Sequence, residues 1–208
     1  MRYLVIFCAL FFTTSLEAQD GKQKMKTEFG AGLKAGLNFQ QTSNQGFEEE
    51  FNTNPLAGIY TQVFVNKVGL SVEALWSTNN YTTDSSFNGL FSQYLNQGVD
   101  SAIGRSFTFH NISVPVLLNY KLLNRLWLQA GPQFTTVATV VDKDNVVQSG
   151  QEIFYTGDIS LVAGVQLKLI KNISVGSRYL FAISNNNNWD TSTQWDNRQL
   201  QAYLCIGL

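Results

Sequence analysis

Apolar and polar residues alternate along much of this chain with a period of two. The segment from Phe29 to Phe39 shows the pattern best, because its even positions hold only glycine, lysine and asparagine. Its odd positions are Phe29, Ala31, Leu33, Ala35, Leu37 and Phe39. Since alternate side chains of a β-strand point to opposite faces, this segment is expected to be a strand with one apolar face and one small, polar face.

Eight stretches can be read as two-faced strands in which one face carries no Asp, Glu, Lys or Arg. They are expected at residues 28–39, 55–65, 68–77, 107–120, 125–138, 154–169, 172–182 and 198–208. The connections between them alternate strictly between long and short, beginning and ending with a long one. Outer-membrane barrels have short periplasmic turns and long external loops. The sequence therefore predicts an all-β fold, an eight-stranded antiparallel up-and-down transmembrane β-barrel.

Two prolines interrupt this pattern. Pro115 and Pro132 fall inside the fourth and fifth expected strands, where proline removes a donor from the hydrogen-bond ladder. A β-bulge near either proline would shift the face of every later residue in that strand by one position. The face assignment of these two strands therefore depends on whether such a bulge exists.

A soluble, lipocalin-like barrel would show the same alternation, with its apolar face turned inward. Its other face would then meet water and should be rich in Lys and Glu. In this chain that face is mostly Gly, Ser, Asn and Gln, and charged residues make up only 14% of the sequence. Small and amide side chains suit a narrow, packed lumen, so the pattern favours the transmembrane barrel.

The N-terminus has the pattern of a secretory signal peptide. A short basic start precedes an apolar run from Tyr3 to Phe12, and cleavage is expected after Ala18. Residues 1–18 are thus the predicted signal peptide, 19–27 a polar periplasmic lead-in, and 28–208 the barrel. Cys8 follows Phe7 rather than a small residue, which argues against a lipoprotein. Cys205 is then the one cysteine of the mature chain, and its place in a strand indicates packing rather than redox chemistry.

Several short segments resemble the PorT-like outer-membrane β-barrel family of Bacteroidota-type bacteria. The most telling is HNISVPVLLNYKLLNRLWLQAGPQF (residues 110–134), in which a Val-Pro strand is followed by a turn and a strand that ends in Ala-Gly-Pro. The segments GLKAGLNF (32–39), VEALWS (72–77) and GSRYLFAIS (176–184) look like corresponding parts of that family. The resemblance implies a bacterial outer-membrane barrel, and the family's namesake implies an association with protein secretion.

The inward face of the predicted barrel carries five charged residues. They are Lys34, Glu73, Asp158, Lys168 and Arg178. Because an unpaired charge in a narrow lumen is costly, these side chains should pair or hold water, forming a structural plug of ion pairs and amides. The sharper alternative is an ion-selective or proton-relay path. Glu73 and Arg178 lie at similar depths in opposite strands and are the expected ion pair, with Lys34 as the rival partner.

Other candidate chemistry is sparse. His110, the one histidine, could act as the base of a lipid-modifying barrel with Ser113 or Ser106, but no acidic residue lies nearby in sequence to orient it. An interfacial histidine is the plainer interpretation. No metal site, catalytic residue or cofactor is predicted, since one histidine and one mature cysteine cannot build a usual zinc site.

Aromatic and acidic residues gather towards the predicted external loops. Trp76, Tyr81, Trp189 and Trp195 are expected to form an aromatic girdle, with carbohydrate stacking as the sharper alternative. The acidic run Glu48 to Glu50 could bind divalent cations but is more simply a solvated loop. The net charge of −1, with no basic run, gives no case for nucleic-acid partners.

Three functions remain open at this stage. The first is a structural or interaction protein whose external loops, or whose periplasmic rim, contact other proteins. The second is a small porin-like channel. The third is a lipid-modifying enzyme centred on His110. The partner common to all three is the lipid bilayer of the bacterial outer membrane, and the first of them is preferred.

Overall fold

The computed structural model describes residues 26–43, 46–48, 51–96, 102–147, 157–183 and 196–208. The predicted signal peptide, residues 1–18, lies outside the described residues and stays a prediction. The strands are β1 (Thr27–Ser43), β2 (Phe51–Val65), β3 (Val68–Thr82), β4 (Ser106–Lys121), β5 (Leu126–Asp142), β6 (Gly157–Lys168), β7 (Ile173–Ala182) and β8 (Asp196–Gly207).

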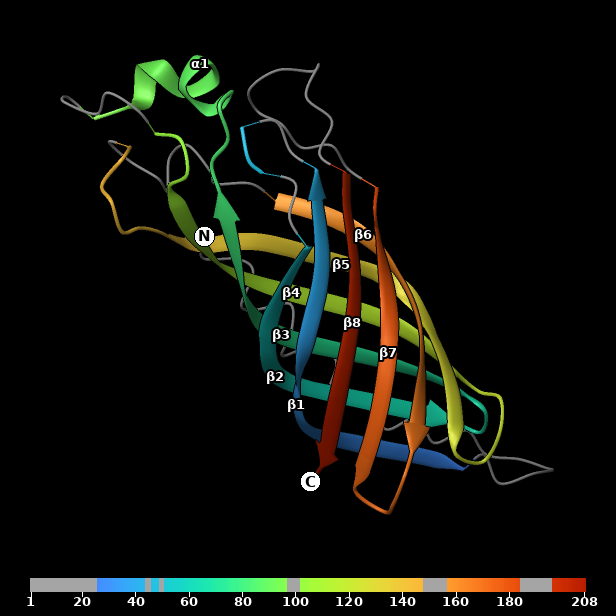
Figure 1. Ribbon diagram of the computed structural model, residues 1–208. Helices are drawn as coiled ribbons and strands as arrows, with labels where there is room; N and C mark the ends of the chain where they lie inside the picture. Colours follow the sequence, from blue (N-terminus) through green and yellow to red (C-terminus); the bar gives the residue numbers. More distant parts are fainter. Residues whose placement is uncertain (1–25, 44–45, 49–50, 97–101, 148–156, 184–195) are drawn as a thin grey trace, which may run out of the picture.

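Each strand pairs antiparallel with its neighbours in sequence, and β1 also pairs with β8 (Figure 1). The closing ladder runs from Gly32 opposite Gly207 to Ser43 opposite Asp196. Closure leaves the sheet without a free edge, as a bilayer requires, because hydrocarbon offers no partner for an unpaired N–H or C=O group. The predicted fold, a closed eight-stranded antiparallel barrel, is confirmed.

The two faces of the strands also agree with the sequence pattern. Leu33 and Val72 point outward, with 52% and 41% of their surfaces exposed, whereas their neighbours Lys34 and Glu73 are buried in the lumen. The barrel thus has a continuous apolar outer face and a polar inner face, which is the arrangement that lipid on the outside demands.

The prolines do not disturb this alternation. Pro115 is fully buried in the lumen, and the β4–β5 register is the same on both sides of it, with Pro115 opposite Gln133 and Leu118 opposite Ala130. The irregularity lies elsewhere, where the register shifts between His110 and Asn111. The β5–β6 register is likewise unbroken at Pro132, which lies opposite Leu161. The assigned faces therefore hold at both prolines, because proline costs one ladder bond without adding a residue to the strand.

The short turns and the long loops lie at opposite ends of the barrel. The turn between β2 and β3 consists of Asn66 and Lys67, and Asn66 adopts a φ of 57°, a left-handed conformation that asparagine tolerates. The C-terminus lies at this end, whereas α1 (Phe87–Phe91) lies at the other (Figure 1). By the rule for outer-membrane barrels, the end with the short turns is periplasmic.

Four strands extend at least four residues further outward than predicted. β1 continues to Ser43 rather than Phe39, and β2 begins at Phe51 rather than Pro55. β3 continues to Thr82 rather than Ser77, and β5 continues to Asp142 rather than Ala138. In β3 the outward apolar residues end at Trp76, and the extension is polar, as in the hydrogen bond from Thr108 Oγ1 to Asn80 Oδ1 (2.9 Å). The hydrophobic pattern marked where the apolar band ends, whereas backbone pairing continues beyond it.

The second external loop, which joins β3 to β4, contains α1 and a 3-10 helix, η2 (Ser92–Tyr94). It packs on a second hydrophobic core at the outer end of the barrel. We call this core the outer cap; its buried residues are Phe47, Phe87, Ala102, Phe107, Phe109, Val146 and Val147. Nothing in the helical parts of the described chain is long and apolar enough to cross a bilayer.

An outward charge near the bilayer midplane should harm folding far more than an inward one. Leu33→Arg and Val72→Arg are each expected to lower the free energy of unfolding by about 2–4 kcal/mol, the usual cost of arginine on the lipid face at that depth. The inward control, Gln62→Lys, should cost clearly less. Urea unfolding in lipid vesicles measures the free energy of unfolding of all three variants. A larger loss for Gln62→Lys than for the two arginine variants would show that the apolar face points into the barrel.

Candidate functional site

A cluster of three buried charged side chains lies in the middle of the lumen. There Glu73 of β3 accepts from two cations at once: Lys34 Nζ lies 2.5 Å from Oε1, and Arg178 Nη1 lies 2.9 Å from Oε2. All three side chains are almost completely buried. Because a carboxylate has two oxygens, Lys34 and Arg178 are not rivals for Glu73 but share it.

This group of two cations and one anion has a formal charge of +1, and neighbouring side chains stabilise the surplus. The ring of Tyr203 lies 4.0 Å from Lys34 Nζ and 5.3 Å from Arg178 Cζ, within the range of cation–π attraction. Arg178 Nε also donates to Gln201 Oε1 at 2.5 Å. Both Tyr203 and Gln201 come from β8, so closure of the barrel brings the charge-balancing groups to the triad.

A glycine on the neighbouring strand makes room for the Tyr203 ring. Gly176 of β7 is paired directly with Tyr203, and a Cβ at this position would lie only 2.4 Å from Cζ of the ring. Any larger residue at position 176 would push the ring away from the two cations. Cys205, two residues further along β8, is free and buried, and it belongs to the same buried cluster as Tyr60 and Tyr203.

An amide network continues from Tyr203 across the lumen. The Tyr203 hydroxyl donates to Gln129 Oε1 (2.6 Å), and Gln129 Nε2 lies within hydrogen-bonding distance of Asn119 Oδ1 (2.8 Å) and Gln166 Oε1 (3.2 Å). Asn119 Nδ2 in turn donates to Ser71 Oγ at 2.9 Å. Side chains from seven of the eight strands thus join in one connected polar cluster. We call it the lumen plug: Lys34, Ser71, Glu73, Asn119, Gln129, Gln166, Arg178, Gln201 and Tyr203.

Of the five charged residues predicted for the lumen, three come together and two do not. Asp158 points inward at the outer end of β6 and accepts a hydrogen bond from Ser160 Oγ (3.4 Å). It lies six residues from Gly164, the ladder partner of Arg178, which is about 20 Å along a strand. Lys168 lies at the opposite, periplasmic end of the same strand. The expectation of a single charged network is corrected here: the face was right for both residues, but their depth keeps them away from the triad.

The structure separates His110 from both serines considered for catalysis; Ser106 begins β4, four residues or about 13 Å along the strand from His110. His110 lies on the outer face, where its ring stacks on Trp76 with a centroid distance of 5.5 Å. Ser113 lies on the opposite face, and its hydroxyl is 3.0 Å from Thr135 Oγ1 inside the barrel. A histidine and a serine on opposite faces of one strand cannot act as a base and its nucleophile. The stacked pair instead marks the outer edge of the apolar band, as an aromatic girdle does.

The other residues singled out in the sequence do not form a second candidate site in the described part of the chain. Tyr81 packs in the outer cap against Phe47 and Phe109 rather than in the girdle. Trp189, Trp195 and two residues of the acidic run, Glu49 and Glu50, lie outside the described residues. Among the residues that the structure does describe, no group of three or more His, Cys, Asp or Glu side chains is placed to hold a metal ion.

A closed antiparallel barrel with an apolar outer face and a polar, filled lumen defines a transmembrane barrel of the outer-membrane type. The chain matches the family model described as outer membrane protein beta-barrel domain over residues 17–188, and it belongs to that family. It is therefore an integral protein of the bacterial outer membrane. The narrower PorT-like assignment stays a prediction. No curated protein matches the chain.

Solved structures of similar shape are distant in sequence. Ail, the attachment invasion locus protein of Yersinia pestis, is 13% identical with a TM-score of 0.46, over 86% of this chain and 97% of Ail. Neisserial surface protein A is 11% identical with a TM-score of 0.42, over 87% of this chain and 98% of that one. A chain from the de novo design of transmembrane β-barrels is 13% identical with a TM-score of 0.40, over 90% and 100%. At these levels the likenesses carry no inference about role.

Breaking the triad should destabilise the barrel in a non-additive way. Glu73→Ala leaves two buried cations without their anion and is expected to cost about 3–5 kcal/mol. Arg178→Ala should cost less, because Lys34 still neutralises Glu73. The double variant should cost clearly less than the sum, since the charge that each single change leaves unpaired is partly removed by the other.

The control for this cycle is Asp158→Ala combined with Arg178→Ala. Asp158 lies far from the triad along the barrel, so these two changes should add within about 0.5 kcal/mol. Unfolding in urea, followed by the heat-induced shift of the folded band on gels, provides all six free energies. Strict additivity of Glu73→Ala and Arg178→Ala would refute the coupling.

Proposed function

We propose that this protein is a non-conducting barrel with a structural and interaction role, whose outer cap presents a fixed surface to external partners. The observation that carries the proposal is the lumen plug. Its side chains reach across the barrel at mid-height from seven strands. Leu117, Val162 and Leu180 add a buried apolar cluster. A tube of eight strands is narrow enough for such side chains to fill it.

The outer cap supports the interaction half of the proposal. Phe87 of α1 is fully buried against Phe47 and Phe107, which come from the first loop and from β4. The backbone is held as well, because Thr83 Oγ1 donates to the carbonyl of Ala102. A loop with its own buried core displays its surface in one conformation and loses little entropy when a partner binds. An association with secretion rests on the PorT-like resemblance alone.

Purified protein in planar bilayers should show no stepwise conductance. We expect the charged, hydrogen-bonded plug to block hydrated ions, because its side chains cross the lumen, and its surplus positive charge should oppose cations in particular. A general-diffusion porin reconstituted in the same way is the positive control. Reproducible single-channel steps, abolished by heating the protein to its unfolded form, would overturn the non-conducting assignment and favour the channel.

The cap itself can be tested by trypsin digestion at Arg105, whose backbone is pinned by Thr83 although its side chain is exposed. Phe87→Ala should leave a cavity that destabilises the cap by about 3–5 kcal/mol. Cleavage after Arg105 should then be at least tenfold faster, while the barrel's heat-shifted band stays unchanged. The matched control is Ile103→Ala, an exposed residue of the same loop, which should leave the rate within about twofold. Equal rates in the wild type and Phe87→Ala would show that the loop has no stable core.

A further inference from the structure

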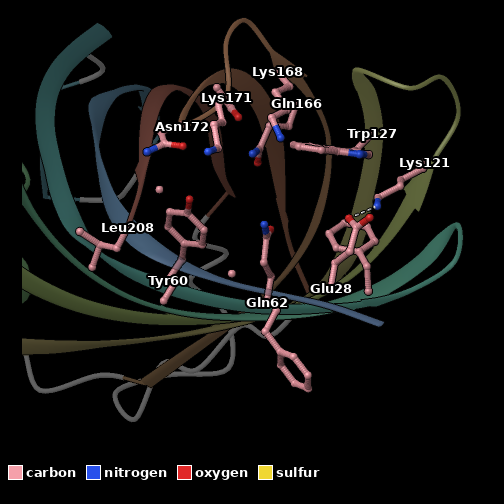
Figure 2. A pocket seen from close by; sticks show the side chains of 16 residues that line it. Glu28, Tyr60, Gln62, Lys121, Trp127, Gln166, Lys168, Lys171, Asn172 and Leu208 are labelled. Carbon is pink, nitrogen blue, oxygen red and sulfur yellow. Dashed lines mark hydrogen bonds and ion pairs between the residues drawn. The ribbon is translucent and has the colours of Figure 1, made fainter. Parts of the chain in front are cut away.

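The periplasmic mouth of the lumen contains a cavity that the lumen plug does not fill. Its volume is about 180 Å³, several times the share of one liquid water, which is about 30 Å³. Side chains from both walls line it: Tyr60 and Gln62 of β2 lie across from Gln166, Lys168 and Lys171 (Figure 2). The cavity therefore has room for a small solute together with water.

The polar lining consists mainly of hydrogen-bond donors without protein partners. Trp127 is 7% exposed, and its Nε1 is buried with no acceptor. Within the described part of the chain, the side chains of Lys168, Lys171, Gln62 and Tyr60 likewise form no hydrogen bond or ion pair. Gln166 uses its oxygen to accept from Gln129, which leaves its amide nitrogen free to donate. Six side chains around one cavity, Trp127 among them, therefore have a donor without a protein acceptor.

The charges around the cavity point to the same kind of ligand. Glu28 is the one acidic side chain in the lining, and it is already engaged by Lys121 at 2.6 Å and by Lys26 at 3.0 Å. The ammonium groups of Lys168 and Lys171 on the opposite wall have no such anion. Two unpaired cations next to the side-chain amides of Gln62 and Gln166 match the acceptor oxygens of an oxyanion, whose charge strengthens each hydrogen bond.

We infer that this cavity is a periplasm-facing binding site for an oxyanion, a carboxylate or a phosphate. Lys168 and Lys171 supply the charge, and the side-chain amides of Gln62 and Gln166 supply neutral donors. The site sits on the periplasmic side of the lumen plug, so binding requires no passage through the barrel. The group bound is either a free small anion or the terminal carboxylate of a periplasmic peptide.

The test is a titration of barrel labelled with 15N at tryptophan in lipid nanodiscs, at constant ionic strength. The indole N–H resonance of Trp127, assigned by its absence in Trp127→Phe, reports on the cavity directly. Inorganic phosphate and succinate are the free-anion probes. Acetyl-Ala-Ala-Ala as the free acid, compared with its amide, tests a peptide carboxylate. A saturable shift is expected with at least one anionic probe and none with the amide.

Matched lysine variants separate a site from general attraction to a basic rim. Lys168→Gln combined with Lys171→Gln should weaken binding at least tenfold. Lys67→Gln removes a lysine from an exposed turn at the same rim, outside the lining, and should change the affinity less than twofold. If the double variant fails to fold, Lys171→Gln alone, on an exposed turn, should still weaken binding severalfold. A shift that never saturates, or equal weakening by Lys67→Gln, would overturn the proposal.

Discussion

Closure of the sheet between β1 and β8 is the constraint from which the other features follow. Hydrocarbon offers no hydrogen-bond partner, so a sheet edge left open in the bilayer would expose a row of unpaired N–H and C=O groups, each costing several kcal/mol. The twelve register pairs from Gly32–Gly207 to Ser43–Asp196 remove that edge. Closure with eight strands also makes the tube narrow, so every inward side chain must find its partner inside.

The triad of Lys34, Glu73 and Arg178 meets that demand and also specifies the register. A buried ion pair is weak evidence for stability, because desolvation offsets much of the attraction. Its consequence for strand pairing is clearer. A slip of β1 by one residue would turn Lys34 out into lipid and leave Glu73 with one cation fewer. An apolar lumen would fill the same space but would penalise such a slip far less.

The sequence predicted the strands, their faces and the central ion pair, because each follows from a period of two and from depth along a strand. Lys34, Glu73 and Arg178 could be placed at one height by counting from the turns. The contacts of Gln129 with Tyr203 and Gln166 could not, since they depend on how the strands stagger around the barrel. Asp158 and Lys168 show the same limit: parity gives the face, whereas ten residues of one strand separate them by about 33 Å.

The outer cap was missed for a different reason. Phe87 and Ala102 stand in a loop rich in Asn, Ser, Gly and Thr, with no period that marks them as buried. Their burial depends on Phe107, whose inward direction is set by β4, and on Val146 from the next loop. Only the assembled barrel brings these segments together, so no local pattern could reveal the core they form.

The two ends of the lumen are consequently built by opposite chemistry. The outer end carries an apolar core, in which buried aromatic rings need no partner beyond one another. The periplasmic end keeps unpaired donors, including Trp127 and Lys168, around a hollow that opens to water. A buried donor without an acceptor lowers stability. Larger side chains could have filled the hollow, as they fill the centre of the lumen, so its unpaired donors are not a necessity of packing. The two ends of the barrel therefore differ in kind: the external end has a rigid surface, and the periplasmic end has the proposed anion-binding cavity. The lumen plug separates them.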